Sequence, residues 1–496
     1  MIAKIRYCFK SLKLSELCRF LSYGLAFFTS GSAVASTDDY YWAAWITPSR
    51  HFNSPLEACS QFEEGGVYDV VGVRMQLPTA WLCTFKRKLD GQLDYVGVER
   101  KGSNCPIGRF SNDTLGVCNN DEQKGAPPPD SCVGNPINAA VGNKFQLEVD
   151  YQFKVGGGSV FSRSYNSFDG LWRHNYSAYL RFATGQLSLV HADGRESFYT
   201  ISGGTVRADP TETGILVKSG DNWLYTSKDN HQYLFDAEGR LAEWKDVEGF
   251  TKKLTYENRN ITVSSAGVYL FTFTEDAQHQ PLSFTAPDTQ IAYYYDSNNH
   301  LTQLTRTRGL QTERRKFSYE DTRNTGLLTG ITDERGIQFA TWAYDEKGRA
   351  ISSQHSGGAG LTQVAYNADG SSTVTNELGK TTVYQYQQIG GIKRVTSIKG
   401  EPSANCPGSN SSYTYNDRGL VLTKTDAKGL ITTYEYNDRG LEISRTEASG
   451  TTLARTTITE WDPDLFLPIR VIEPNRVTVY SYDNQGRELT RQSTSR

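Results

Sequence analysis

A short motif recurs along the second half of the chain, and this repeat constrains the fold more than any other feature of the sequence. The motif is an aromatic residue, Asp or Asn, two variable residues and Gly. Weaker copies, in which Thr or Lys replaces the aromatic residue, lie between the strong ones, for example Thr425-Asp426 to Gly429. The six strong copies are Phe235-Asp236 to Gly239, Tyr344-Asp345 to Gly348, Tyr366-Asn367 to Gly370, Tyr415-Asn416 to Gly419, Tyr436-Asn437 to Gly440 and Tyr482-Asp483 to Gly486.

Each motif predicts one β-turn that closes a hairpin. The Asp or Asn side chain bonds the backbone two residues further on, and Gly at the fourth position adopts the positive φ that the reversal needs. Between successive glycines there is room for one strand of six or seven residues. The residues predicted to carry these turns are Asp236, Gly239, Asp345, Gly348, Asn367, Gly370, Asn416, Gly419, Asp426, Gly429, Asn437, Gly440, Asp483 and Gly486.

The segments between the turns alternate in polarity with a period of two, which is typical of strands. In the segment 430–436, Leu430, Thr432, Tyr434 and Tyr436 share one side. A single hairpin cannot bury such a face, so neighbouring hairpins should pair into a long sheet that coils on itself. The 29 Tyr, 45 Gly and only two Met agree with an all-β fold.

Residues 1–35 are predicted to form a secretory signal peptide. Basic residues come first, the apolar run Phe20 to Phe28 follows, and Ala33-Val34-Ala35 is a small-residue cleavage site. A membrane anchor is the alternative, but the apolar run is about half as long as the roughly 20 residues of a spanning helix. The prediction is a secreted, periplasmic or cell-surface protein with no stable membrane span.

Six cysteines remain after cleavage, and five of them precede residue 133. In an oxidising compartment, disulfides are the default. Cys105 with Cys118 is a candidate local pair, although spacing alone leaves the connectivity open. Zinc is the alternative, but the sequence has no Cys-x-x-Cys pair, so no metal or cofactor is predicted.

The chain divides into four predicted regions. After the signal peptide, a Cys-containing head spans 36–130 and ends in the Pro-rich linker 125–130. Short β-like stretches separated by Gly-containing turns make a β module over 131–230, and the repeats occupy 231–496.

The motif resembles the YD repeats of bacterial RHS proteins, in which Arg or a hydrophobic residue follows the Gly, as at Gly239-Arg240 and Gly348-Arg349. The region before the repeats resembles the β module that leads into RHS repeats. The segments that carry this likeness are 135–143, 163–167, 170–174 and 193–195, so the resemblance spans about 132–496. It implies repeats that wind into a hollow β-shell. Many family members enclose a toxic C-terminal domain released at an Asp-containing core motif; neither toxin nor core motif is recognised in this sequence.

No familiar catalytic pattern is present. Gly379-Lys380-Thr381 resembles the end of a phosphate-binding loop, but Val374 stands where its first Gly is required. Gly-x-Ser-x-Gly and His-Glu-x-x-His are both missing, which leaves only a triad assembled from distant strands. Trp172-Arg173-His174 is the densest polar and aromatic cluster outside the repeats, and core packing is favoured over a binding site for it.

The sequence therefore predicts an exported RHS scaffold or shell protein without catalytic activity, linked to bacterial competition or cell contact. The alternative is a carbohydrate- or cell-surface-binding protein that uses its Tyr-rich faces; an enzyme of unrecognised type is a third class. Predicted partners are another RHS segment, a toxin or effector chain, or a second copy bound through the C-terminal end of the sheet. The formal net charge of −3 argues against nucleic acid.

Overall fold

The computed structural model describes residues 41–52, 55–63, 66–77, 80–101, 110–112, 117–119, 123–153, 160–183, 186–400, 410–483 and 486–496. These residues fold almost entirely as strands and turns, so the all-β prediction is confirmed. The predicted signal peptide, residues 1–35, lies outside the described residues, and so do Cys105 and Cys406. The predicted Cys105–Cys118 pair therefore stays a prediction.

The head contains a five-stranded antiparallel sheet in the order β2-β1-β5-β4-β3 and one short helix, α2. A separate hairpin, β6-β7, follows it. The elements are β1 Tyr41–Ala44, β2 Thr47–Phe52, α2 Pro55–Ser60, β3 Tyr68–Leu77, β4 Ala80–Arg87, β5 Leu93–Lys101, β6 Phe110–Asn112 and β7 Val117–Asn119.

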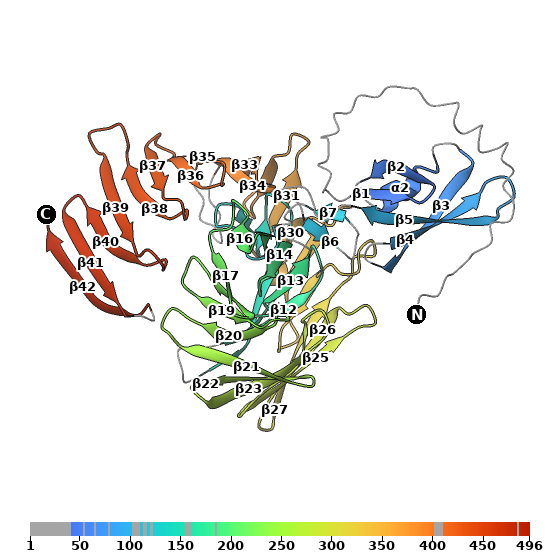
Figure 1. Cartoon of the computed structure of the whole chain (residues 1–496), viewed down its shortest axis with the longest axis horizontal. Helices are drawn as coiled ribbons and strands as arrows, with labels where there is room; N and C mark the ends of the chain where they lie inside the picture. Colours follow the sequence, from blue (N-terminus) through green and yellow to red (C-terminus); the bar gives the residue numbers. More distant parts are fainter. Residues whose placement is uncertain are drawn as a thin grey trace. The chain divides into compact units, whose positions relative to one another are not determined.

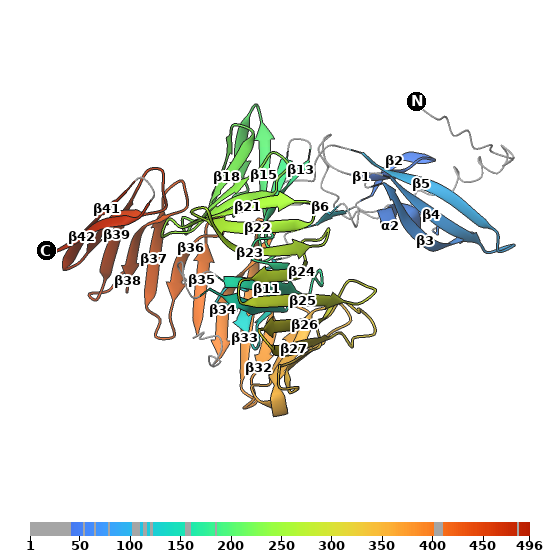
Figure 2. The ribbon, with the colours of Figure 1, turned by 90° about the horizontal axis from the view of Figure 1, so that it is seen from below.

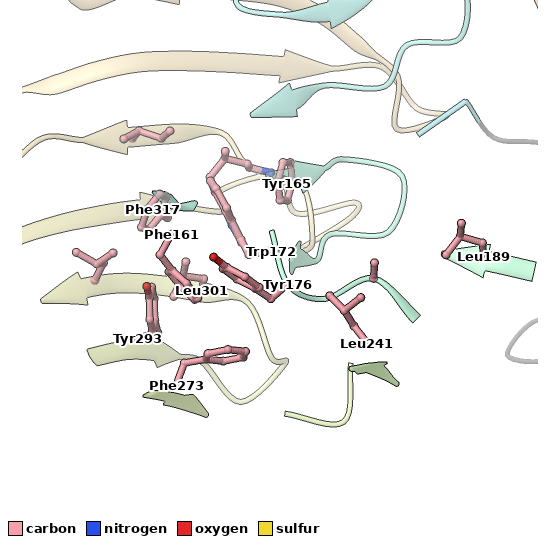
Figure 3. Packing of buried hydrophobic residues seen from close by; sticks show 14 of the residues in the cluster. Phe161, Tyr165, Trp172, Tyr176, Leu189, Leu241, Phe273, Tyr293, Leu301 and Phe317 are labelled. Atoms are coloured by element: carbon pink, nitrogen blue, oxygen red, sulfur yellow. Dashed lines mark hydrogen bonds between the residues drawn. The ribbon is translucent and has the colours of Figure 1, made fainter. Parts of the chain in front are cut away.

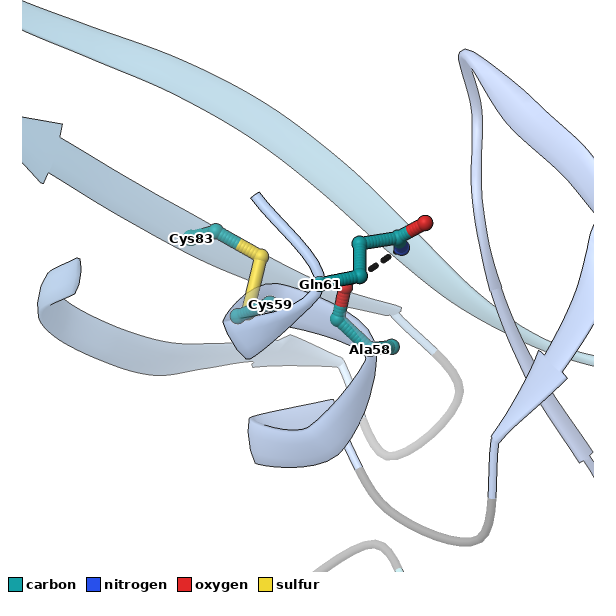
Figure 4. Close-up of a disulfide and its surroundings, with 4 residues drawn as sticks. All are labelled: Ala58, Cys59, Gln61 and Cys83. Atoms are coloured by element: carbon teal, nitrogen blue, oxygen red, sulfur yellow. Dashed lines mark hydrogen bonds between the residues drawn. A yellow bond between two sulfur atoms is a disulfide. The ribbon is translucent and has the colours of Figure 1, made fainter. Parts of the chain in front are cut away.

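A disulfide joins α2 to the head sheet. Cys59 at the end of α2 is bonded to Cys83 on β4, and both residues are fully buried (Figure 4). Trp42, Phe85 and Val98 pack in the same small core. The two cysteines are 24 residues apart in the sequence. A cross-link that closes a loop of this length stabilises a fold by about 3 kcal/mol. The expectation of disulfides in the head is thus confirmed. The spacing of the cysteines in the sequence does not single out this pair.

The β module is made of three small antiparallel sheets, β8-β9, β10-β11-β12 and β13-β14-β15-β16. Its strands are β8 Cys132–Val133, β9 Ile137–Asn138, β10 Phe145–Gln152, β11 Val160–Asn166, β12 Trp172–His174, β13 Tyr179–Ala183, β14 Gln186–Val190, β15 Glu196–Ser202 and β16 Thr205–Ala208.

The repeats form one antiparallel sheet of 26 strands, β17 to β42, in which each strand pairs with the next one along the chain (Figures 1 and 2). The sheet begins before residue 231, because β17 and β18 already belong to it. The first strands are β17 Ile215–Ser219, β18 Asn222–Thr226, β19 Gln232–Phe235, β20 Leu241–Lys245, β21 Thr251–Glu257, β22 Asn260–Ser265, β23 Val268–Glu275, β24 Pro281–Ala286, β25 Thr289–Tyr295, β26 Leu301–Arg308, β27 Gln311–Ser318, β28 Gly330–Thr332 and β29 Gln338–Tyr344. They continue as β30 Ala350–His355, the 3-10 turn η1 Ser356–Gly358, β31 Thr362–Tyr366, β32 Ser372–Thr375, β33 Thr381–Ile389, β34 Ile392–Gly400, β35 Ser411–Tyr415, β36 Val421–Thr425, β37 Ile431–Tyr436, β38 Glu442–Glu447, β39 Arg455–Trp461, β40 Pro468–Glu473, β41 Arg476–Tyr482 and β42 Glu488–Ser495.

The turn at Asp345 shows why the motif reverses the chain. Gly348 N donates to Asp345 O at 3.0 Å, and Asp345 N donates to Arg349 O at 2.9 Å. The Asp345 carboxylate accepts from Lys347 N at 3.0 Å, as the motif predicts, and also from Arg349 N at 2.9 Å. Gly348 has φ 75°, a conformation that favours Gly because it has no Cβ. One side chain and one Gly thus define the hairpin.

Several turns of the same kind escape the sequence motif because another residue stands in the Gly position. His279, Asn299 and Asn230 have φ of 62°, 64° and 59°. Asp276 N donates to Gln280 O and His279 N to Asp276 O, which repeats the bonds of the Asp345 turn. These turns extend the repeat array into the region where the motif is not visible.

The β module packs against one face of the repeat sheet and shares a continuous hydrophobic core with it. Figure 3 shows Phe161, Trp172 and Tyr176 of the module grouped with side chains of the sheet such as Phe273, Tyr293 and Phe317. We call the face of the repeat sheet that contacts the module the inner face. Beyond Ile398 the core cluster ends, and Leu441 and Phe466 are the buried hydrophobic side chains of the described residues there.

Candidate functional site: the inner face of the repeat sheet

The inner face can be followed strand by strand, because directly opposed residues of paired strands lie on the same side of a sheet. Where the β module covers it, the opposed pairs are apolar or small. They include Phe273 with Phe284, Tyr293 with Leu304, Trp342 with Ser353, Val364 with Val374 and Tyr384 with Ile398. The covered half of the inner face, β18 to β34, is therefore an ordinary core surface.

A buried ion pair anchors the module to this half. Arg163 is fully buried, and its guanidinium bonds the Asp150 carboxylate through Nε and at 2.9 Å through Nη2. Tyr293 of the sheet donates its hydroxyl to Asp150 at 2.8 Å. The Trp172 ring centre lies 4.7 Å from the guanidinium. Removing one partner would leave a buried charge unpaired, and the Tyr293 hydroxyl links this ion pair of the module to the sheet.

Lys144 is a second buried cation at the junction. Its ammonium group donates to the carbonyl oxygens of Asn135 and Phe145 at 2.6 and 2.5 Å, and to the Gln146 side chain at 2.8 Å. The Trp342 ring centre lies 4.2 Å away. Burial places the pKa of Lys144 well below its usual value. Neutral acceptors satisfy this lysine, so its contacts are those of a structural group.

Trp172-Arg173-His174, the cluster singled out from the sequence, forms strand β12 and is buried throughout. Arg173 pairs with Asp169 at 2.9 Å. His174 Nε2 lies 2.8 Å from a Glu275 oxygen, and His279 Nδ1 lies 2.9 Å from the other. Burial raises the pKa of Glu275, but the hydrogen bonds from the two histidines outweigh it and lower that pKa to about 2. The cluster connects module and sheet, which agrees with core packing.

A Ser–His pair lies in the module, where a hydrolytic site could be suspected. His191 Nε2 lies 2.7 Å from Ser197 Oγ, which also donates to Glu212. Arg195 donates to His191 Nδ1 at 3.4 Å, so Nδ1 is the acceptor and Nε2 carries the proton. The imidazole therefore donates to the serine and has no free nitrogen to take its proton. Ser197 is also buried.

The motif tyrosines bind the backbone of the preceding repeat. Tyr344 OH donates to Leu328 O at 2.7 Å, and Tyr366 OH donates to Ala350 O at the same distance. Trp461 Nε1 makes the equivalent bond to Glu442 O at 2.8 Å. The same bond is made by Tyr256, Tyr295, Tyr415, Tyr436 and Tyr482. We call these bonds latches; the sequence shows the recurring Tyr but not the acceptor.

The second half of the inner face, β35 to β42, differs in composition. Ser411 lies opposite Ile398, and Tyr413, two residues further on, shares its side of the sheet. From there three of the opposed pairs on this side combine Tyr with a cation. They are Tyr413 with Lys424, Tyr434 with Arg445 and Tyr480 with Arg491. These tyrosines are half-buried; Tyr413 packs against the edge of the core cluster under the module, whereas Tyr434 and Tyr480 do not. This half of the inner face is thus polar and aromatic.

The described residues also line an open pocket of about 480 Å³ beside the turns at 321–327 and 345–348. Asp321 pairs with Arg323, and Asp345 pairs with Arg349, each at 2.6 Å. The bond from Arg323 is the main cause that lowers the pKa of Asp321 to about 2. The carboxylates of Asp321 and Asp345 are therefore engaged in turn structure. Within the described ranges no cluster of His, Cys, Asp and Glu is arranged to hold a metal ion, and no helix has the length and hydrophobicity of a membrane span.

Two known families match the chain. The RHS Repeat family matches residues 415–452, and a domain of unknown function, DUF6531, matches residues 134–199. No curated protein matches the chain.

Solved structures of Tc toxin components show distant similarity. TcdB2-TccC3 without its hypervariable C-terminal region has a TM-score of 0.38 at 10% identity, over 84% of this chain and 27% of that chain. TcdB2-TccC3-Cdc42 has a TM-score of 0.33 at 11% identity, over 84% and 26%. A Tc holotoxin pore of Photorhabdus luminescens has a TM-score of 0.24 at 13% identity, over 84% and 23%. The chain thus spans about a quarter of the length of these structures.

Strand pairing and latched hairpins define a tandem-hairpin β-repeat protein with a module packed on its sheet. The family match falls on two of these hairpins, β35-β36 and β37-β38. The repeat sheet thus carries RHS repeats, and residues 134–199, which match DUF6531, lie in the module that precedes them.

Proposed function

We propose that this RHS-repeat protein is an exported scaffold without catalytic activity of its own, whose β35–β42 inner face receives a toxin or effector chain or another RHS segment. The change of composition along the inner face supports the proposal. The module side of that face is apolar and filled, whereas the β35–β42 side offers half-buried tyrosines in register with Lys424, Arg445 and Arg491.

The chemistry of this surface indicates the kind of partner it suits. Tyrosine supplies a large contact area and a hydroxyl, and it is enriched with Arg at interfaces. Lys424 lies over the Tyr413 ring at 5.7 Å and Arg491 over the Tyr480 ring at 5.3 Å. A partner surface that presents carboxylates and hydrogen-bond acceptors would pair with these cations. The proposed contribution to bacterial competition or cell contact follows from such a partner.

The test is co-purification of the chain with the protein encoded beside it. A K424E/R445E double variant reverses two charges of the inner face and should lose the partner, about tenfold or more in affinity for two close charge pairs. R470E is the matched control, because Arg470 lies on the opposite side of the same sheet, paired with Glu460. A partner that stays bound to the double variant, or is lost equally from R470E, contradicts the proposed surface.

Export has its own test. Cleavage after Ala35 predicts that the protein collected outside the cytoplasm begins at Ser36. N-terminal sequencing of that material would show it, and a protein that keeps residues 1–35 or stays in the cytoplasm would contradict export.

Carbohydrate binding is a second candidate, favoured by the same half-buried tyrosines, since sugar rings stack on aromatic faces. A glycan array with the purified chain separates the two. Binding that a Y434A variant abolishes would support this candidate, and a uniformly negative array would remove it.

A further inference from the structure

One asparagine side chain joins a turn and a loop that are far apart in the sequence. Asn230 lies in the turn between β18 and β19, and Phe466 lies in the loop between β39 and β40. Asn230 Nδ2 donates to Phe466 O at 2.8 Å, and Phe466 N donates to Asn230 Oδ1 at 2.7 Å. A single side chain thus satisfies both backbone groups of a residue 236 positions further along the chain.

The backbone at Asn230 explains why Asn stands there. Asn230 has φ 59° and donates its N–H to Ser227 O at 2.8 Å, as the Gly of the repeat motif does. Gly would adopt this conformation with less strain but has no side chain to reach Phe466. Asn tolerates the left-handed region better than most residues with a Cβ. The position therefore keeps the turn and adds a two-point contact.

The loop that receives this contact is also held from its own side. Phe466 is only 4% exposed, and the Arg439 guanidinium lies 5.7 Å from the centre of its ring. Arg439 donates to Leu465 O at 3.2 Å and to Asp462 O. Contacts within the late strands thus shape the loop independently of Asn230.

A second contact lies beside the first. Arg418, in the turn between β35 and β36, donates to Pro210 O at 3.1 Å, just before β17. Its Nη1 donates to Asp438 O in the next turn at 2.7 Å. Two turns near the end of the sheet therefore contact its beginning. Asn230 binds the one that lies further along the chain, the β39–β40 loop.

We infer that Asn230 is a closure clip. It fastens the β39–β40 loop to the start of the repeat sheet, and its release lets β39–β42 move away from β18–β19 while the strand pairing of the sheet stays intact. Of the contacts between late turns and the start of the sheet, this two-point contact is the one that holds the last four strands. This inference is independent of the partner proposed above.

N230G tests the clip, because it keeps the turn conformation and removes the contact. Hydrogen exchange of the segment 462–468 should become about tenfold faster or more, since two hydrogen bonds are lost, and the radius of gyration in solution should increase. N258G is the matched control. Asn258 has φ 56° in an exposed turn between β21 and β22, so this variant makes the same chemical change away from Phe466.

N230D distinguishes the two halves of the contact. It retains an acceptor for Phe466 N but places a carboxylate oxygen against Phe466 O, so exchange in 462–468 should rise at least as much as in N230G. Unchanged exchange there in N230G, an equal rise in N258G, or wild-type behaviour of N230D would each overturn the clip.

Discussion

At the scale of single residues, the latch tyrosine fixes how each repeat packs on the one before it. Its ring packs along the inner face, and its hydroxyl satisfies a carbonyl oxygen that follows the preceding turn, as Tyr366 does for Ala350. The Arg after the turn adds to this arrangement. Arg349 pairs with Asp345 of its own turn and lies 4.2 Å from the centre of the Tyr366 ring. Asp, Gly, Arg and the next Tyr thus form one connected unit.

The latch predicts the effect of removing a single hydroxyl. Y366F should cost about 1 kcal/mol, because Ala350 O loses its donor while the ring still packs. Faster hydrogen exchange of the peptides that contain Ala350 and Tyr366 would measure it. Y294F is the control, since Tyr294 is 49% exposed on the opposite side of its strand. If the two variants exchange equally, the latch contributes nothing.

At the scale of elements, the turns have two kinds of surroundings. Gly429 has φ 79°, and a Cβ built there would have no heavy atom within 4 Å. Gly239 has φ 87°, but its Cβ would lie 2.4 Å from Leu180 O of β13 in the β module. Leu180 N also donates to Gly239 O at 2.8 Å. The first turn needs Gly for its backbone alone, and the second needs it for the backbone and the close approach of the module.

Two alanine variants separate these requirements. G429A should destabilise its hairpin by about 1 kcal/mol, the cost of a Cβ at positive φ, and leave the module unaffected. G239A should cost more, because the turn or β13 has to move, and exchange should also rise in the segment 179–183. Local hydrogen exchange of both hairpins is the measurement, and equal effects confined to each hairpin would contradict the distinction.

The sequence predicted the turns well because the motif states their physical requirements directly. Gly419, Gly429 and Gly440 indeed have φ of 71°, 79° and 81°. It could not reveal the turns at Asn230, His279 and Asn299, since nothing in the motif marks these residues as adopting a conformation that favours Gly. Nor could it find the inner-face pairs such as Tyr434 with Arg445, because they depend on the register between strands. The Cys59–Cys83 pair was hidden for the same reason, as it depends on where α2 packs.

At the scale of the whole molecule, buried charged groups join the β module to the repeat sheet. Asp150, which pairs with Arg163 inside the module, accepts a hydrogen bond from Tyr293 of the sheet, and Glu275 of the sheet bonds His174 of the module. Glu275 is the group through which acid would loosen this junction, because its pKa is lowered to about 2. A carboxyl whose pKa is lower in the folded than in the unfolded state stabilises the fold above its unfolded pKa. That contribution is lost as the pH falls from about 4.5 towards 2.

E275Q should therefore be less stable than the wild type at neutral pH, by roughly 3 kcal/mol for a carboxylate held this way, and less sensitive to acid below pH 4.5. Denaturant unfolding followed by tryptophan fluorescence reports on the junction, because Trp172 and Trp342 are buried there. The control is E238Q, which removes a carboxylate from an exposed turn. Its acid profile should follow the wild type, since general charge repulsion changes equally in both variants. If E275Q and the wild type lose stability in parallel between pH 4.5 and 2, Glu275 does not hold the module to the sheet, and the acid response arises elsewhere in the chain.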